Sequence, residues 1–376
     1  MIKPPEYILN IKPYIPGKPI EELERELGIK DSIKLASNEN PVGPSPMALK
    51  AIVDSLMSSS PSNSINRYPD GSGYCLKMAL SERLSVREDE LILGNGSNEL
   101  IDIAVRTFLQ PGDEAVMAHP SFIVYPMAVQ ATGGRPVQVP LRDYTHDLDA
   151  MADAVTRKTK MMLIANPNNP TGTINKRYEF DRLMDRLPDG ILVVVDEAYH
   201  EYVADPDYAD SMKHFRGGRD ILILRTFSKI YGLAGLRIGY GIARKDIILE
   251  MNKLRPPFNT SSLAQNAAVH ALKDENHVRY SREINEGGKR YLYRELDSLN
   301  LKYILTEANF IYILLGRENP PCPLLVKGGA WGLYNELLRH GVIVRPVGPE
   351  GIRVTIGLPE ENERFIEALK DVMREA

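Results

Sequence analysis

One lysine in the second half of the chain is well placed for covalent chemistry. Lys229 follows Thr226 and Ser228 directly after an apolar run, and Arg237 comes after the glycines that follow the lysine. A lysine at the edge of an α/β sheet can lose enough hydration to act as a nucleophilic amine and form a Schiff base with an aldehyde. The two hydroxyls and the arginine could then hold a phosphate. Taken alone, the segment equally allows a loop lysine in solvent and an arginine paired with a surface acid.

A second apolar run ends in an aspartate that could serve the same chemistry. Ile191–Val195 delivers Asp196 to the carboxyl end of a strand, where open α/β sheets bind their ligands. A carboxylate there can pair with a protonated ring nitrogen, and Tyr199 could offer its hydroxyl to the same ring. Asp196 could instead cap the following helix. The run is also similar to the acidic motif of nucleotide hydrolases, but the chain lacks a GxxxxGK(S/T) loop, which excludes that interpretation.

Two further segments place hydrogen-bond donors next to apolar runs. In Asn166–Gly172, an asparagine amide in a turn fixed by prolines could point an N–H at a phenolate oxygen, although such a segment alone is usually only a turn. Gly94–Glu99 lies between an apolar run and an amphipathic helix. Backbone N–H groups at a helix N-terminus suit a phosphate. The segment is not GxGxxG, so a dinucleotide is not indicated.

Seven apolar runs separated by helical periods must position these residues. Several runs are rich in Val, Ile and Leu on both faces, which is typical of parallel strands covered by helices on both sides. The runs are Leu91–Leu93, Ala115–Ala118, Pro136–Leu141, Met161–Ala165, Ile191–Val195, Ile221–Leu224 and Ile238–Ile242. The sequence therefore predicts a mostly parallel, seven-stranded α/β sheet.

The two ends of the chain predict a smaller α+β domain. At the N-terminal end, a proline-rich arm precedes a helix over Glu21–Leu27, and Gly28 is expected to end this helix. Near the C-terminal end, a long helical stretch is expected to break near Gly287 and Gly288. The remaining predicted elements are the helical stretch Ser261–Leu299, the strands Val342–Arg345 and Ile352–Ile356, and the helix Glu360–Met373. We expect an arm and part of the small domain over 1–45, a large domain over 46–265, and a linking helix with the rest of the small domain over 266–376.

Composition excludes several classes of protein. The chain has 46 basic and 50 acidic residues and a net charge of −4, whereas a nucleic-acid-binding surface needs a basic excess. Its two cysteines, Cys75 and Cys322, are too few for a disulfide framework or a tetrahedral thiolate site, which favours a reducing cytoplasm. We see neither a secretory signal nor an apolar run of about 18 residues that could cross a membrane. We therefore expect a cytoplasmic enzyme without a metal.

The order and spacing of these segments resemble the pyridoxal-phosphate enzymes of fold type I, the aspartate aminotransferase superfamily. Within it, the chain is most similar to the branch that acts on histidinol phosphate, from about Tyr14 to the last helix. The segments that carry the resemblance are Leu35–Pro41, Arg67–Gly71, Gly94–Glu99, Asn168–Gly172, Val195–Tyr199, Thr226–Lys229, Ala234–Arg237 and Gly351–Arg353. The resemblance implies the fold type I architecture, a large cofactor-binding domain with a small α+β domain.

The resemblance also implies a role for each cofactor-binding residue. Lys229 would hold pyridoxal 5'-phosphate covalently and move a proton during the reaction, Asp196 would pair with its pyridine nitrogen, and Phe122 would stack on its ring. Many relatives carry tyrosine at the position of Phe122. Asn169 and Tyr199 would bind the phenolic oxygen of the cofactor. The phosphate would be held by Ser97, Asn98, Thr226, Ser228, Arg237 and, from the other subunit of a homodimer, Tyr68.

Substrate binding is assigned to residues from the two chain ends. Arg353 matches the arginine that grips the substrate carboxylate in the superfamily, and Arg345 could add a cation for a substrate phosphate. Tyr14 could cover the site, and Asn38 is assigned to it as well. Alternatively, Arg345 is a charge on a strand surface and Tyr14 only packs the arm.

The expected reaction transfers an amino group from glutamate to imidazole-acetol phosphate, giving histidinol phosphate and 2-oxoglutarate. Amino acids and keto acids are thus the expected small-molecule partners. The expected assembly is a homodimer whose active sites are shared between the two subunits. Two alternative functions would use the same fold and cofactor. They are an aromatic amino acid aminotransferase and a threonine-phosphate decarboxylase. A cofactor-binding regulator without catalysis would need an N-terminal DNA-binding module, for which the short arm leaves no room.

Overall fold

The computed structural model describes residues 2–57, 65–316 and 323–375. It divides into two compact units. The large unit comprises Met1–Tyr14, Gly43–Asn169 and Ile174–Val278, and the small unit comprises Ile15–Val42, Pro170–Thr173 and Arg279–Ala376. The units thus change over at 42/43 and 278/279, where the sequence suggested 45/46 and 265/266, and the first part of the arm clusters with the large unit.

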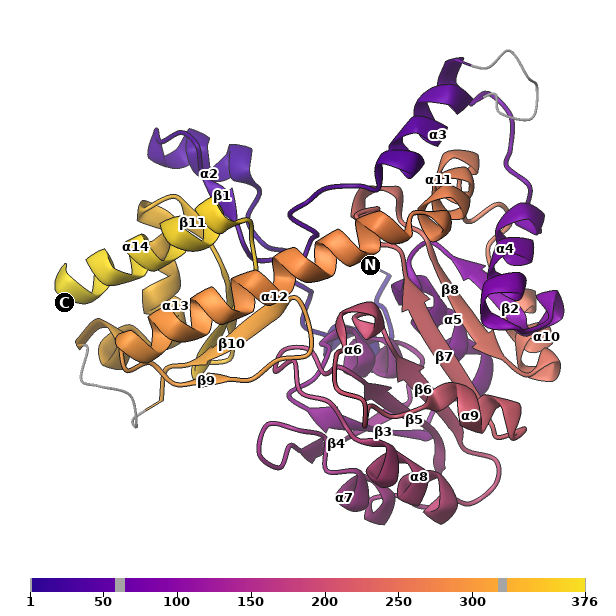
Figure 1. Cartoon of the computed structure of the whole chain (residues 1–376). Helices are drawn as coiled ribbons and strands as arrows, with labels where there is room; N and C mark the ends of the chain where they lie inside the picture. Colours follow the sequence, from indigo (N-terminus) through magenta and orange to yellow (C-terminus); the bar gives the residue numbers. More distant parts are fainter. Residues whose placement is uncertain (1, 58–64, 317–322, 376) are drawn as a thin grey trace. The chain divides into compact units, whose positions relative to one another are not determined.

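A seven-stranded sheet forms the centre of the large unit (Figure 1), with the strand order β2-β8-β7-β6-β5-β3-β4. The strands are β2 (Leu91–Gly94), β3 (Glu114–His119), β4 (Arg135–Pro140), β5 (Thr159–Ala165), β6 (Leu192–Asp196), β7 (Ile221–Thr226) and β8 (Gly239–Ala243). Strands β4, β3, β5, β6 and β7 run parallel, and β8 is antiparallel to both β7 and β2. The prediction of a mostly parallel sheet built from these seven runs is confirmed.

Both faces of this sheet are buried. On one face, alternate strand residues such as Leu192 and Val194 join a core cluster with apolar side chains of α5, α6 and α10. The residues between them, Val193 and Val195, are buried as well. This explains why the strands read as continuous apolar runs rather than as an alternating pattern. The helices of the large unit are α1 (Glu6–Leu9), α3 (Pro46–Met57), α4 (Tyr74–Leu84), α5 (Ser97–Phe108), α6 (Val124–Ala131), α7 (Leu148–Asp153), α8 (Arg177–Arg186), α9 (Ser211–Arg216), α10 (Lys245–Leu254) and α11 (Ser262–Lys273).

The small unit combines helices with two short sheets. A four-stranded antiparallel sheet has the order β12-β13-β10-β9, and a separate parallel pair joins β1 to β11. Its elements are α2 (Ile20–Leu27), β1 (Ile33–Lys34), β9 (Tyr303–Ile304), β10 (Phe310–Leu314), α13 (Pro323–Arg339), β11 (Val342–Ile343), β12 (Arg345–Val347), β13 (Gly351–Thr355) and α14 (Pro359–Glu375), with most of α12 (Glu275–Ser298). The predicted strand Val342–Arg345 is divided at Val344, because its first half pairs with β1 and its second half with β13.

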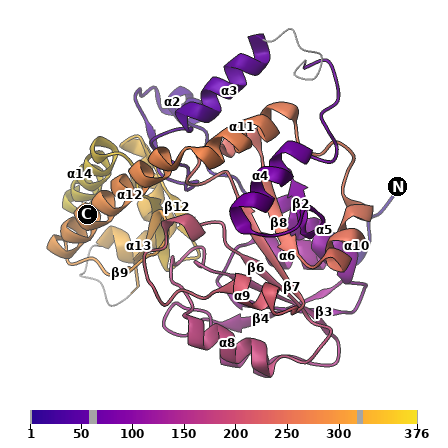
Figure 2. The same cartoon turned by 45° about the vertical axis from the view of Figure 1, so that its right-hand side comes forward.

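The predicted helix break near Gly287 and Gly288 was wrong. Helix α12 runs unbroken through both glycines (Figure 2), and the break lies at Asp274, between α11 and α12. Asp274 accepts hydrogen bonds from the backbone N–H of His277 at 3.1 Å and from Ser45 Oγ at 2.7 Å. Gly288 is there for packing, since a Cβ at this position would overlap Cγ2 of Ile356. Close approach to a neighbouring strand end, rather than a helix stop, explains this glycine.

The ends of the chain follow the sequence prediction in most respects. Helix α2 ends at Gly28 in the left-handed conformation, with φ of 68°, and α14 buries Phe365 and Leu369 as expected. The proline-rich arm is irregular except for the single turn of α1. Among the residues that the structure describes, no helix has the length and apolar character that crossing a membrane requires.

Candidate active site

The lysine singled out by the sequence lies just beyond the carboxyl end of β7. Ser228 donates its backbone N–H to Thr226 Oγ1 at 3.1 Å, and the Lys229 carbonyl accepts from Gly232 N–H at 2.9 Å. These bonds fix the backbone on both sides of Lys229. Its Nζ atom lies 5.5 Å from the centre of the Tyr199 ring. The structure therefore brings Lys229 and Tyr199 together, at the sheet edge that the sequence predicted.

Asp196 ends the neighbouring strand and is buried at the same edge. It pairs in register with Leu224 of β7 and Ala165 of β5, so it stands between the lysine loop and the asparagine-rich loop. Only 7% of its surface is exposed. Burial raises the pKa of Asp196 to about 6, although hydrogen bonds from Tyr125 and Ala198 and the charge of Lys229 oppose the rise. The side chain is thus a costly buried carboxylate that packing alone would not require.

Tyr125 is a site residue that the sequence reasoning missed. Its hydroxyl donates to Asp196 Oδ2 at 2.9 Å. It lies at the start of α6, three residues beyond Phe122, and the two rings meet edge to face with their centres 5.5 Å apart. The sequence carries no signal for this role, because an aromatic residue in an apolar helix looks like an ordinary core residue. Phe122 itself is half-buried and packs against the core cluster of the large unit.

The loop after β5 is fastened to the loop that carries Phe122. Asn168 Oδ1 accepts from Ser121 Oγ at 2.8 Å and from His146 Nε2 at 3.0 Å. Burial lowers the pKa of His146 to about 4, so its ring stays neutral and its Nε2 carries the proton that it donates. These bonds hold the asparagine-rich turn beside the Phe122 loop. Asn169, the next residue, is half-buried.

Three donors converge where α5 begins. Arg237 Nη1 donates to Ser228 Oγ at 3.1 Å. A Cβ on Gly96 would overlap Nη2 of the same arginine, and a Cβ on Gly239 would lie 2.6 Å from the Ser97 backbone nitrogen. Only glycine at positions 96 and 239 allows the Arg237 guanidinium, the Ser228 hydroxyl and the Ser97 N–H to come this close. Asn98 follows Ser97 in the first turn of α5. Such a group of donors at a helix N-terminus binds an anion, and a phosphate above all.

A buried ion pair lies directly behind these residues. Arg225 Nε and Glu197 Oε2 are 2.8 Å apart, and Ser211 Oγ also donates to the Glu197 carboxylate. Burial alone would raise the pKa of Glu197. The charge of Arg225 nevertheless keeps that pKa below its ordinary value. Glu197 follows Asp196 and Arg225 precedes Thr226, so the pair ties together the ends of the two strands that carry the site.

Two arginines of the small unit face each other across antiparallel strands. Arg345 of β12 pairs in register with Arg353 of β13, and both side chains are half-buried. Arg353 donates to the Ala36 carbonyl at 2.6 Å, and Arg345 to the Ile15 carbonyl at 2.7 Å. Like charges directly opposite each other destabilise a sheet. A bound anion would offset that cost.

The remaining predicted residues of the arm and the loops differ widely in exposure. They are Asn38 and Tyr14, predicted to bind substrate, and Tyr68, predicted to bind the cofactor phosphate. Asn38 is 1% exposed, and its backbone N–H and side-chain oxygen both contact Thr355 Oγ1, at 2.9 and 3.1 Å. Tyr14 is 48% exposed. Tyr68 is 82% exposed and stacks on Phe258 with the ring centres 4.7 Å apart. Its exposure leaves one face of the Tyr68 ring open to a second molecule.

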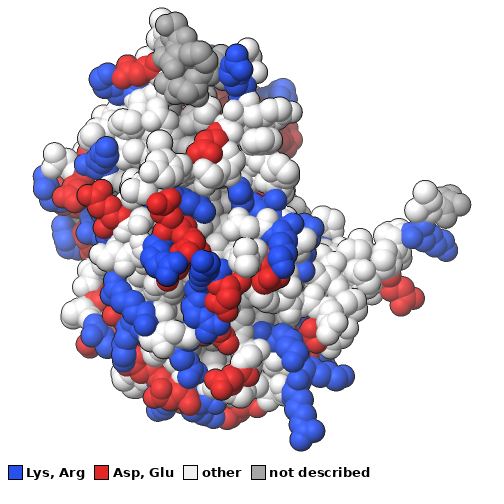
Figure 3. Space-filling model, turned by 90° about the vertical axis from the view of Figure 1, so that its right-hand side faces the viewer, with Lys and Arg blue, Asp and Glu red and all other residues white. Residues whose placement is uncertain are grey.

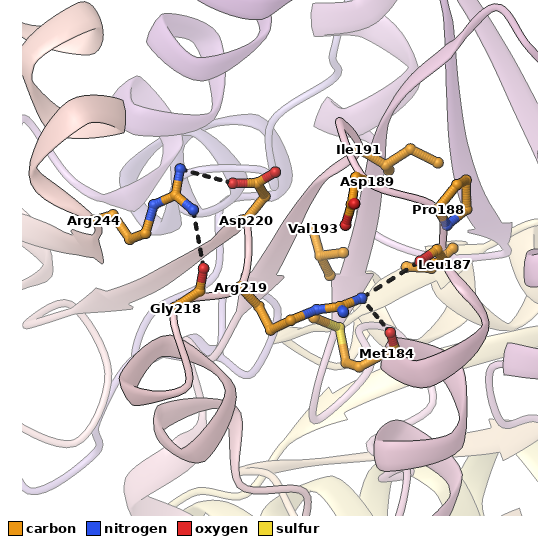
Figure 4. Close-up of a pocket in the computed structure, with 10 residues that line it drawn as sticks. All are labelled: Met184, Leu187, Pro188, Asp189, Ile191, Val193, Gly218, Arg219, Asp220 and Arg244. Atoms are coloured by element: carbon orange, nitrogen blue, oxygen red, sulfur yellow. Dashed lines mark hydrogen bonds and ion pairs between the residues drawn. The ribbon is translucent and has the colours of Figure 1, made fainter.

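A hollow of about 220 Å³ lies at the opposite edge of the sheet, beside the amino ends of β6 and β7 (Figure 4). Arg219 donates there to the carbonyls of Met184 and Leu187, and Arg244 donates to the Gly218 carbonyl at 2.9 Å. Both arginines thus hold the walls of the hollow together. None of the predicted site residues lines it. Among the described residues, no group of three or more His, Cys, Asp or Glu side chains is arranged to hold a metal ion.

Comparison with known proteins agrees with this geometry. A family model described as aminotransferase class I and II matches residues 30–369. The histidinol-phosphate aminotransferase of Moorella thermoacetica is 50% identical over 373 residues, which cover 98% of this chain and 92% of that protein. Histidinol-phosphate aminotransferase 1 of Nitrosococcus oceani is 45% identical over 372 residues, 98% of this chain and 96% of that protein.

Among solved structures, the fold is similar to histidinol-phosphate aminotransferase from Sinorhizobium meliloti in complex with pyridoxal-5'-phosphate. The TM-score is 0.87 at 26% sequence identity, and the match covers 98% of this chain and 97% of that one.

Proposed function

We propose that this chain, which belongs to the class I and II aminotransferases, transfers an amino group between glutamate and the histidinol phosphate/imidazole-acetol phosphate pair with pyridoxal 5'-phosphate as cofactor. The observation that carries the proposal is the gathering of three groups at one sheet edge. They are the amine of Lys229, the buried carboxylate of Asp196, and the donors around Arg237. The names of relatives at 50% and 45% identity support the choice of substrate.

The residues at the sheet edge fit this cofactor group by group. The amine of Lys229 suits an aldehyde, Asp196 suits a protonated ring nitrogen, and the donors of Ser97, Ser228 and Arg237 suit a phosphate. When bound, the cofactor supplies an electron sink for the substrate Cα. Asn169 lies in the loop after β5 and Tyr199 in the turn after β6, and both would donate to the phenolic oxygen.

The protein residues then perform the proton chemistry. With the cofactor bound, the amine of Lys229 would take the proton from the substrate Cα and return it to the carbon of the cofactor's aldehyde group, two bonds away. Asp196 would be ionised and would keep the ring nitrogen protonated. The Tyr199 ring, 5.5 Å from Nζ, limits the volume in which the amine moves. The Glu197–Arg225 pair holds the strand ends so that these positions persist.

The opposed arginines support a substrate pair that carries both carboxylate and phosphate. Arg353 and Arg345 are neighbours in register, so one anion can bridge them or two anionic groups can share them. Planar guanidinium groups bind carboxylate and phosphate equally well. The carboxylate of glutamate and the phosphate of histidinol phosphate would thus use the same pair in successive half-reactions.

We further propose a homodimer whose sites are shared between subunits, in the cytoplasm. Helix α3 exposes Leu49, Val53 and Met57, and Tyr68 and Phe258 form an exposed aromatic pair on the same unit. Exposed apolar side chains on one unit are typical of an interface. In the dimer, Tyr68 would reach the cofactor phosphate of the other subunit.

The charged residues on the face shown in Figure 3 give no sign of a nucleic-acid partner. Lys and Arg are interspersed there with Asp and Glu, so that face offers no continuous basic surface.

The test is a comparison of substrates by kcat/KM with 2-oxoglutarate as acceptor. We expect histidinol phosphate to exceed phenylalanine by about a hundredfold or more, because the phosphate adds a charge-assisted contact of about 3 kcal/mol. Threonine phosphate serves as a second donor that carries a phosphate but no imidazole. A preference for phenylalanine would establish the aromatic aminotransferase instead, and release of CO₂ from threonine phosphate would establish the decarboxylase.

A further inference from the structure

Tyr125 is a buried tyrosine that the chemistry outlined above does not use. It is 1% exposed and sits among apolar side chains of the core cluster of the large unit. A phenylalanine would fill this space equally well, so the hydroxyl requires its own explanation. That hydroxyl donates to Asp196 Oδ2 at 2.9 Å. Burial and the neighbouring carboxylate raise the pKa of Tyr125 well above its ordinary value, so the proton stays on the tyrosine and the direction of the bond is fixed.

The carboxylate of Asp196 is held at both oxygens. Tyr125, from α6, donates to Oδ2, and the backbone N–H of Ala198, in the turn after β6, donates to Oδ1 at 3.2 Å. Two donors from two different elements prevent the carboxylate from rotating about its last bond. Each carboxylate oxygen accepts more than one hydrogen bond. Either oxygen of Asp196 can therefore accept a further hydrogen bond from a ring N–H, while the plane of the carboxylate stays fixed.

The tyrosine is itself held in place. The Phe122 ring meets it edge to face at 5.5 Å with an interplanar angle of 86°. On its other sides it contacts the core cluster. The hydroxyl therefore has a fixed position relative to β6, as a group that orients another side chain requires.

We propose that Tyr125 is a positioning residue, which orients the Asp196 carboxylate so that it pairs with the protonated ring nitrogen of the cofactor. The inference rests on the proposed function, because it assigns the partner of Asp196 in the reaction. It predicts that loss of one hydroxyl changes the protonation of the ring nitrogen without changing the fold. A tyrosine that only fills the core predicts a change in stability alone.

The test compares Tyr125→Phe with Tyr312→Phe. Tyr312 is also buried, at 4% exposure, and its hydroxyl donates to the Val347 carbonyl at 3.4 Å within the small unit. Two quantities are measured on each protein, the dissociation constant of pyridoxal phosphate from the apo-protein and the ¹⁵N chemical shift of cofactor labelled at its ring nitrogen. For Tyr125→Phe we expect the dissociation constant to rise about tenfold to a hundredfold, as for loss of a hydrogen bond to a charged group. We also expect the ¹⁵N signal to move toward that of unprotonated pyridine. Tyr312→Phe should leave both quantities unchanged.

A double variant tests whether the effect acts through Asp196. In an Asp196→Asn background, Tyr125→Phe should change the dissociation constant by less than about threefold, since the charge that it orients is gone. An equal effect in both backgrounds, or an unchanged ¹⁵N signal in Tyr125→Phe, would overturn the proposal. The ¹⁵N spectra are recorded with excess cofactor, which stabilises a weakened variant. Wild-type protein that fails to bind pyridoxal phosphate would overturn the proposed function itself, whereas tight binding by wild type and Tyr125→Phe alike would overturn only this inference.

Discussion

At the scale of single residues, burial and charge decide which side chains do chemistry. Asp196 is 7% exposed and costly to bury, yet β6 delivers it to the edge where Lys229 stands. The sequence identified Lys229, Asp196 and Tyr199 because polar residues directly after apolar runs stand out. It missed Tyr125 because an aromatic residue in an apolar helix looks like an ordinary core residue, and only the 2.9 Å contact with Asp196 distinguishes it.

The raised pKa of Asp196 predicts a pH dependence of apo-protein stability. Its pKa is about 6 in the folded protein, against 3.8 for an aspartate side chain in water, so the folded state binds the proton more tightly. Stability from this group is complete below pH of about 4 and is lost as pH rises through about 6, a total of roughly 3 kcal/mol. Thermal unfolding of the apo-protein against its Asp196→Asn variant measures it. The wild type should lose stability relative to the variant over this range, and parallel curves would show that Asp196 is not perturbed.

The paired arginines predict different effects on the two half-reactions. Arg353→Ala should weaken the reactions of glutamate and histidinol phosphate alike, by roughly 2–5 kcal/mol, because an anion loses its bidentate partner. Arg345→Ala should act more strongly on histidinol phosphate, because its phosphate carries a larger negative charge than a single carboxylate. Single-turnover kinetics of each half-reaction measure both effects. Small and equal effects of Arg345→Ala on phosphorylated and unphosphorylated donors would remove Arg345 from phosphate binding.

At the scale of elements, the sequence predicted what depends on local pattern and missed what depends on packing. All seven strands of the large sheet were found, because burial on both faces gives continuous apolar runs. Strands β1 and β9 were missed, since each is only two residues long, and β10 was missed although its five residues form an apolar run. The break at Gly287 and Gly288 was wrong because Gly288 is required by its contact with Ile356, a constraint from outside the helix.

The two glycines of α12 provide a matched test of that explanation. Gly288→Ala should destabilise the protein by about 1–3 kcal/mol, because the added methyl overlaps Ile356. At Gly287 nothing lies within 4 Å of the added atom, so Gly287→Ala should stabilise by about 0.5–1 kcal/mol through helix propensity. Unfolding by urea measures both variants. Equal effects of the two substitutions would show that Gly288 is not a packing residue.

At the scale of the whole molecule, the chain forms a large unit with the residues that we propose bind the cofactor and a small unit with the arginine pair. The sequence suggested a large and a small domain, and their boundaries were placed where apolar strand-like runs give way to charged helical stretches. In the structure, the large unit ends at Val278 and the small unit resumes at Arg279. This boundary lies inside the unbroken helix α12, where no local feature of the sequence marks it. The second subunit is inferred from exposed residues such as Tyr68, for which the structure of one chain shows an open ring face.

Mixed subunits test the shared site. In a hybrid of Lys229→Ala and Tyr68→Ala subunits, one site carries both defects and the other carries none if Tyr68 acts across the interface. After subunit exchange, an equal mixture should therefore exceed the summed activity of its parents. If Tyr68 served its own subunit, every hybrid site would keep one defect, and the mixture would show no gain.

We propose that Lys229 is the amine that binds the cofactor, and direct mapping of the attachment point tests this assignment. Purified protein loaded with pyridoxal phosphate is reduced with borohydride, digested and sequenced by mass spectrometry. We expect a single major adduct on the peptide that contains Lys229, and no adduct at that position in Lys229→Ala. Lys213, an exposed lysine of the same unit, is the internal reference for nonspecific labelling. A major adduct on another lysine, or labelling of Lys229 no greater than that of Lys213, would show that Lys229 does not bind the cofactor.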